Sequence, residues 1–105
     1  MWLRRELTRI GEDGRESVVL VEIGDPVQAL GGEPGSVRVR IEGAGARIDG
    51  DRRIYGEDSM QALLLGIGFA RTLLESDEAF AGGRLFWIEE EGGLDLELPS
   101  PPVVE

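Results

Sequence analysis

The chain has 105 residues, no cysteine, no histidine and a formal net charge of −10. This length predicts a single domain, and the missing residue types exclude disulfides, thiol chemistry and any site that needs an imidazole. The acidic surface argues against binding to nucleic acid or to anionic membranes, whose phosphates it would repel, and favours a basic protein partner.

The composition also points to a location and a source. No run approaches the roughly 18 apolar residues of a membrane span, and the N-terminal MWLRRELTR lacks the apolar region of a signal peptide. We therefore expect a cytoplasmic protein. All eleven basic residues are arginine, and asparagine is absent along with lysine. Both missing residues use A-rich codons, which indicates a GC-rich bacterial genome.

A β-hairpin is expected at the start of the chain. Residues 1–10 fit either a helix or a strand, but Asp13-Gly14 follows them, and this pair supplies the positive φ angles of a tight turn. The β-branched and apolar residues 17–23 then read as the second strand. Pro26 ends that strand, because proline cannot donate a ladder hydrogen bond.

Two more strands are expected before the helix. In residues 36–42, SVRVRIE, the apolar side chains alternate with charged ones, which predicts one core face and one solvent face. We expect Arg38 and Arg40 on the solvent face to pair with acidic residues of neighbouring strands rather than hold an anion. Residues 48–55 predict a short strand around the turn signal Asp49-Gly50.

One main helix is expected after Asp58. Asp58 is a suitable N-cap, Gln61 stands at the capping-box position, and the helix should end near residues 75–77. At about 100° per residue, one half of the helix is apolar and should face the sheet. Its members are Met60, Ala62, Leu63, Gly66, Ile67, Phe69, Ala70, Leu73 and Leu74. The small row Ala62, Gly66 and Ala70 predicts a close approach of the helix to the sheet.

The other half of the helix carries a candidate contact site. Leu64 and Leu65 lie there beside Gly68 and Thr72, and one helix on one sheet does not bury them. Either a loop of the same chain covers these leucines or another chain does. We therefore single out Leu64, Leu65, Gly68 and Thr72 as a candidate interface.

Two further strands are expected after Gly82-Gly83, at residues 84–89 and 94–98, joined by a turn at residues 90–93. The fold class is then α+β: an antiparallel sheet of about five or six strands with one main helix on one face, in the order β-β-β-β-α-β-β. Residues 1–98 form the domain, and residues 99–105 are a proline-rich C-terminal tail.

Residues 55–63, YGEDSMQAL, resemble a small bacterial family of unknown function whose helix begins with Tyr-Gly-x-Asp-Ser-x-Gln-Ala-Leu. Residues 23–26, Ile-Gly-x-Pro, are similar to the same family's early strand end. The resemblance implies no activity, cofactor or catalytic residue. Helix capping explains the polar residues of the motif, so we expect a structural role at the helix start for Tyr55, Gly56, Asp58 and Gln61.

No motif in the chain predicts catalysis or a cofactor. The acidic runs 49–51 and 89–91 lack the converging oxygens of a cation site, and the glycine runs do not open a helix after a strand. The serines have no histidine or lysine to activate them. We therefore expect no metal, no cofactor and no enzymatic activity. Three functions stay open: a protein-interaction module of the immunity or accessory type, a structural homodimer through the outer helix face, and a carboxylate-dependent enzyme.

Overall fold

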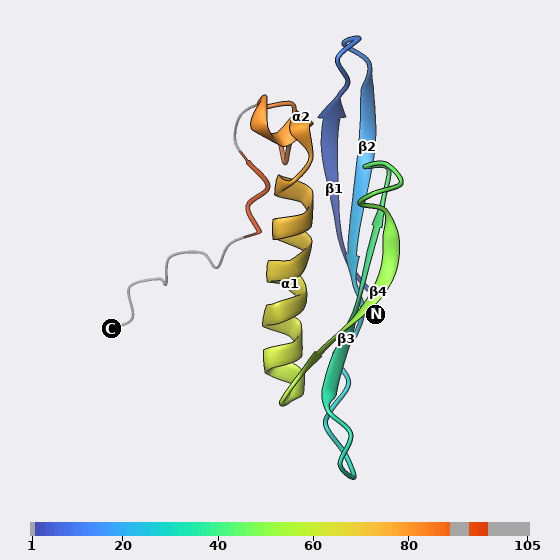
Figure 1. Ribbon diagram of the computed structural model, residues 1–105, viewed down its shortest axis with the longest axis vertical. Helices are drawn as coiled ribbons and strands as arrows, with labels where there is room; N and C mark the ends of the chain where they lie inside the picture. The colour runs from blue at the N-terminus through green and yellow to red at the C-terminus, as the bar shows by residue number, and fades with distance from the viewer. Residues whose placement is uncertain (1, 89–92, 97–105) are drawn as a thin grey trace, which may run out of the picture.

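The structure, a computed structural model, describes residues 2–88 and 93–96. Figure 1 shows a two-layer arrangement, with the main helix lying along one face of an antiparallel sheet. The strand order in the sheet is β4-β3-β2-β1-β5. The elements are β1 Leu3–Ile10, β2 Glu16–Ile23, β3 Gly35–Glu42, β4 Gly50–Gly56, α1 Ser59–Glu75, α2 Glu78–Ala81 and β5 Leu85–Phe86. The expected α+β class, with one main helix on the sheet, is confirmed.

The expected hairpin at the N-terminus is confirmed. β1 and β2 pair along their whole length, from Leu3 opposite Ile23 to Ile10 opposite Glu16. The turn between them places Gly14 at φ +81°, a left-handed conformation that glycine adopts without strain. Of the two structures that fit this segment, helix or strand, the strand is observed for Leu3–Ile10, because the turn brings these residues beside β2.

The alternation expected for β3 is also confirmed. Val37, Val39 and Ile41 are fully buried on the helix side, while Arg38 is exposed on the other. β4 begins at Gly50 rather than at residue 48. The Asp49 carboxylate stays in the preceding loop, where it accepts hydrogen bonds from the main-chain N–H groups of Gly43 and Ala44.

α1 begins and ends where the capping residues predict. The Asp58 side chain accepts a hydrogen bond from the Gln61 N–H at 2.7 Å, and Ser76 is the C-cap. The buried residues of α1 are Ala62, Gly66, Ala70 and Leu74. Met60 does not join them, since it is 70% exposed and the prediction that it faces the core is wrong. The buried row sets the direction in which the helix faces the sheet, and Met60 stands about 100° away from the centre of that row.

The C-terminal part differs from the expected pair of strands. A short helix, α2, follows α1 directly, and β5 contains only Leu85 and Phe86, which pair with Thr8 and Arg9 of β1. Residues 94–96 are not a strand, although Leu94 is buried. The expected turn at 90–93 and the tail at 99–105 lie largely or wholly outside the described residues. No described helix is long and apolar enough to cross a membrane.

Candidate functional site

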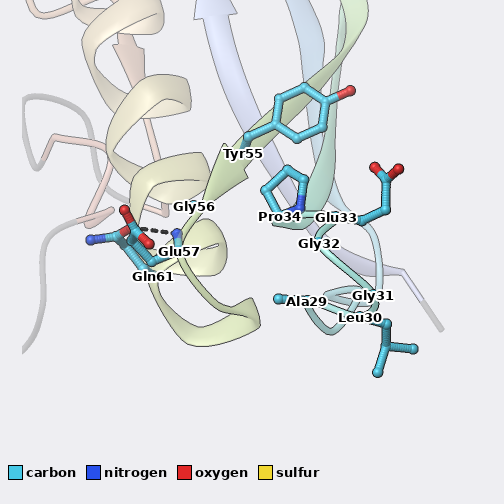
Figure 2. A pocket seen from close by; sticks show the side chains of 10 residues that line it. All are labelled: Ala29, Leu30, Gly31, Gly32, Glu33, Pro34, Tyr55, Gly56, Glu57 and Gln61. Atoms are coloured by element: carbon cyan, nitrogen blue, oxygen red, sulfur yellow. Dashed lines mark hydrogen bonds between the residues drawn. The ribbon is translucent and has the colours of Figure 1, made fainter.

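The helix start lies beside a hollow that the motif residues help to line. Its wall is formed by the loop 29–34 together with Tyr55, Gly56, Glu57 and Gln61. Figure 2 shows that the side chains of Leu30, Glu33 and Tyr55 point in different directions rather than toward a common centre. The Gln61 side-chain oxygen accepts from the Glu57 N–H at 2.7 Å, so this amide serves the helix start. The hollow shows no convergent set of polar groups.

Two glycines explain how the helix start meets the sheet. Gly35 and Gly56 pair across β3 and β4. A Cβ on Gly35 would lie 2.3 Å from the Asp58 carbonyl carbon, and a Cβ on Gly56 would lie 2.5 Å from the Ala62 nitrogen. Backbone therefore packs on backbone here. Gly56, Asp58 and Gln61 are placed at the helix start, while the side chain of Tyr55 is exposed and lines the hollow beside them.

A second and more apolar hollow runs between α1 and the strands β1 and β2, with a volume of about 680 Å³. We call it the α1–β1 groove. Its apolar surface comes from both layers of the fold and from the segment after β5. The lining residues are Leu3, Val21, Ile23, Leu64, Ile67, Gly68 and Leu96, with Arg4, Arg5, Arg71 and Asp95 around them.

The groove exists because α1 sits over β3 and β4 rather than over the middle of the sheet. A Cβ on Gly66 would lie 2.6 Å from Val37 Cγ1 and 3.3 Å from Val39 Cγ2, so this glycine lets the helix contact β3 directly. The expected close approach is confirmed. At Gly68, a Cβ would meet no atom within 4 Å, so the flank of α1 on the β1 side remains open.

The groove separates the two leucines that the sequence grouped together. Leu64 and Gly68 line it, whereas Leu65 and Thr72 are exposed outside it. Leu64 is 46% exposed and Leu65 is 49% exposed, so the two differ in surroundings and not in exposure. The strand residues Leu3, Val21 and Ile23 were not anticipated as part of a site. The alternation of residues 3, 5 and 7 on one face of β1 was the signal that could have indicated Leu3.

The rim of the groove is arginine-rich, in contrast to the acidic chain as a whole. The Arg5 guanidinium lies 3.7 Å from the centre of the Trp87 ring and donates to the main-chain carbonyl oxygens of Leu94 and Asp95, at 3.3 and 2.6 Å. Arg71 pairs with Glu75 at 3.2 Å. The contacts of Arg5 hold the segment 94–95 against β1, and this segment forms part of the groove wall.

The opposite face of the sheet carries a charge network. Arg38 pairs with Asp51. Arg40 pairs with Asp51 and with Glu22, and both of these Arg40 distances are 3.4 Å. The hydrogen bond from Arg38 is the main reason that the pKa of Asp51 lies below its ordinary value. The Arg40 guanidinium also lies 4.3 Å from the centre of the Trp2 ring. The prediction that these arginines pair with acids on neighbouring strands is confirmed.

The aspartates of the described residues are mostly engaged in the fold. Asp77 caps α2 by accepting from the Ala79 N–H and pairs with Arg9 at 2.8 Å. The Arg9 hydrogen bond is the main cause that holds the pKa of the buried Asp77 carboxyl below its ordinary value. Within residues 2–88 and 93–96, no three acidic side chains gather as a cation site would require.

Comparison with known proteins gives one result. Residues 3–98 match a sequence family described as a domain of unknown function (DUF6968). No curated protein and no solved structure matches the chain. The matched span covers β1 through the last described residues, so it contains both the helix-start motif and the α1–β1 groove.

Proposed function

The chain belongs to this family of domains of unknown function, and from that premise we propose that it is a non-enzymatic protein-interaction module. The observation that carries the proposal is the α1–β1 groove. A protein of this size exposes Leu3 at 59% and Leu64 at 46% on the two sides of one apolar hollow. Contiguous apolar surface of this kind is typical of a contact site for another chain.

The groove would take apolar side chains of a partner. Its polar rim consists of three arginines and Asp95, while the floor is formed by aliphatic side chains. This arrangement of an apolar centre and a polar rim is the ordinary anatomy of a protein interface. The net charge of −10 would draw a basic partner toward the molecule at long range. An immunity-type or accessory role in the cytoplasm, next to a target protein that is basic overall, fits the net charge, while the arginine-rich rim favours apolar or acidic side chains of that target at the groove itself.

The engagement of four aspartates in the fold supports a role without catalysis. Asp49, Asp58 and Asp77 each accept hydrogen bonds from main-chain N–H groups, and Asp51 is held by two arginines. A general acid or base needs a carboxyl group that can reach a substrate and change its protonation there. The carboxylate-dependent enzyme therefore ranks behind the interaction module.

The two leucines provide a matched experiment. Leu64→Glu places a charge in the groove, and Leu65→Glu places the same charge one residue away on the outer surface of α1. Wild type and both variants are used to capture proteins from an extract of the source organism, and each captured protein is then purified and its affinity measured by calorimetry. We expect Leu64→Glu to abolish binding and Leu65→Glu to retain it.

Chemical denaturation of both variants provides the control for folding. Equal stability of the two would show that lost binding reflects the groove and not an unfolded chain. If only Leu65→Glu lost binding, the contact site would be the outer face of α1 with Leu65 and Thr72 rather than the groove. That face could then bind either a second copy of the chain or a different protein. Binding unaffected by either substitution would refute a role for the groove.

A further inference from the structure

One edge of the sheet is only partly covered. β5 pairs with Thr8 and Arg9 of β1, and the Ile10 N–H donates to the Arg84 carbonyl oxygen beside it. Alternate residues of a strand direct their main-chain groups to the same side. The N–H and C=O groups of Arg4 and Glu6 therefore face the same edge as those of Thr8 and Ile10. Within the described residues, no strand pairs with them there.

An open strand edge is a template for another strand. Arg4 and Glu6 on this edge pair with each other at 3.3 Å and are 57% and 62% exposed, so another strand that presents opposite charges can reach both. Leu3, which ends the edge, is itself largely exposed at the mouth of the α1–β1 groove. A strand added along residues 3–7 would pair the main chain and cover Leu3.

The charges along this edge favour a second copy of the same chain. Around a two-fold axis, antiparallel copies can place the edge-facing residues opposite one another in three ways: Arg4 on Arg4, Glu6 on Glu6, or Arg4 on Glu6. The first two put like charges directly across the pair, which is destabilising. The third puts opposite charges across the pair twice, once on each side of the axis. The axis then passes between the two copies of Arg5, which lie opposite each other, and Leu3 lies opposite Leu7 of the other copy.

We propose that the protein forms a symmetric dimer in which the two β1 strands pair antiparallel over residues 3–7, with Arg4 of each copy opposite Glu6 of the other. The two five-stranded sheets join into one continuous sheet. Arg5, on the axis, keeps its own partners, because its guanidinium is stacked on Trp87 and bonded to the carbonyl oxygens of Leu94 and Asp95. Each Arg5 charge therefore has its own partners within its own chain, although the two residues lie opposite each other.

The other edge of the sheet fits self-association less well. β4 also has an open edge in the strand order, and Asp51 and Arg53 could pair across it in the same manner. However, Asp51 is already engaged with Arg38 and Arg40 of its own chain. A dimer through β4 would have to share or break those ion pairs. The β4 edge therefore serves as a control surface.

Sedimentation equilibrium on the full chain, up to about 1 mM, tests the dimer, since a Kd of 1 mM or below then leaves a clear dimer fraction. We expect a dimer that Arg4→Glu or Glu6→Arg alone weakens at least about 10-fold, because each change turns both cross-pairs into like-charge contacts. The double exchange of Arg4→Glu with Glu6→Arg restores opposite charges and should bring the Kd back to within about 3-fold of wild type. Arg53→Glu on the β4 edge should leave the Kd unchanged.

Glu6→Pro provides an independent variant, because it removes an edge-facing N–H at a strand edge that tolerates proline. It should abolish the dimer while the circular dichroism spectrum stays that of the wild type. A wild-type chain that is monomeric at every concentration, or a double exchange that fails to restore the dimer, would overturn the proposal. A dimer that depends on Leu64 and not on Arg4 and Glu6 would place self-association in the groove. That result would overturn the β1 dimer and leave the groove as the binding surface.

Discussion

The two flanks of α1 meet the sheet in opposite ways. On the β3–β4 side the helix lies directly on the strands, because Gly35, Gly56 and Gly66 leave no side chain in between. On the β1–β2 side the helix stands away from the strands at their Leu3 end, and the α1–β1 groove lies between them. The comparison shows that the same helix stabilises the fold with one flank and leaves apolar surface exposed in a groove on the other.

Two glycines in one turn of α1 illustrate the difference. Gly66 lies so close to Val37 and Val39 that no methyl group would fit between them, whereas Gly68 faces open space. Glycine lowers helix stability at either position by about 1 kcal/mol relative to alanine. At Gly66 the close contact with β3 offsets this cost. At Gly68 no contact in the described part of the chain offsets this cost.

The largest expected effect comes from removing a side chain on the closed flank. Leu74→Ala should lower the free energy of unfolding by about 2–5 kcal/mol, because Leu74 is fully buried and the surrounding strands cannot close the cavity. Urea denaturation measures it. Leu65→Ala, on the exposed surface of the same helix, is the control and should change stability by less than about 0.5 kcal/mol. Similar losses for both would contradict the assigned helix orientation.

Next comes the backbone contact at the helix start. Gly35→Ala should cost about 1–3 kcal/mol or more, since its Cβ would meet the Asp58 main chain at 2.3 Å and neither segment can move without shifting the helix. Thermal and urea denaturation both report the loss. As a comparison, Gly31→Ala lies in the adjoining loop with open space around it, so only its positive φ of 56° would be strained. A neutral Gly35→Ala would mean that the helix start does not rest on β3.

A smaller effect on stability is expected from the ion pair between Arg9 of β1 and Asp77. This pair lies at the opposite end of β1 from Leu3 and the groove. Arg9 holds the pKa of Asp77 in the folded protein below its value in the unfolded chain. As the pH falls, Asp77 is therefore protonated in the unfolded chain before it is protonated in the folded protein. The stabilisation is complete above the unfolded pKa of about 4 and is lost as the pH falls through the folded pKa.

Asp77→Asn should therefore cost about 1–3 kcal/mol at neutral pH, where Arg9 loses its ionic partner. The difference between variant and wild type should shrink in acid. Urea denaturation at a series of pH values between 7 and about 3 measures both curves. Asp51→Asn, whose ion pair is exposed to solvent, should cost less at every pH. Curves that stay parallel for Asp77→Asn would contradict the pKa assignment.

The smallest effect is a gain. Gly68→Ala should raise the free energy of unfolding by about 0.5–1 kcal/mol through helix propensity alone, because its methyl group meets no atom. Gly66→Ala gains the same propensity but places its methyl group 2.6 Å from Val37 Cγ1, so its net effect should be a loss. Denaturation of this matched pair sharpens the comparison of the two flanks. If both variants gained stability, the space between Gly66 and β3 would be large enough to hold a methyl group.

Local patterns in the sequence determined the elements of this protein. Alternation in β3, the Asp-Gly turn between β1 and β2, and the Asp58 cap of α1 are each decided by neighbouring residues, so they could be predicted. The orientation of α1 followed in outline from its apolar half. The same reasoning failed for Met60 and for residues 94–96, because their surroundings come from parts of the chain far away in sequence.

Tertiary structure alone decided the site. Leu64 and Leu65 both fall on the outer half of α1 and are similarly exposed, and only the placement of α1 over β3 and β4 puts the first beside Leu3 and Val21 and leaves the second outside. That placement depends on Gly35, Gly56 and Gly66 meeting backbone and valine side chains across the layers. The contacts of Gly35 and Gly66 join residues more than twenty positions apart in the chain, and no periodicity within one element predicts them.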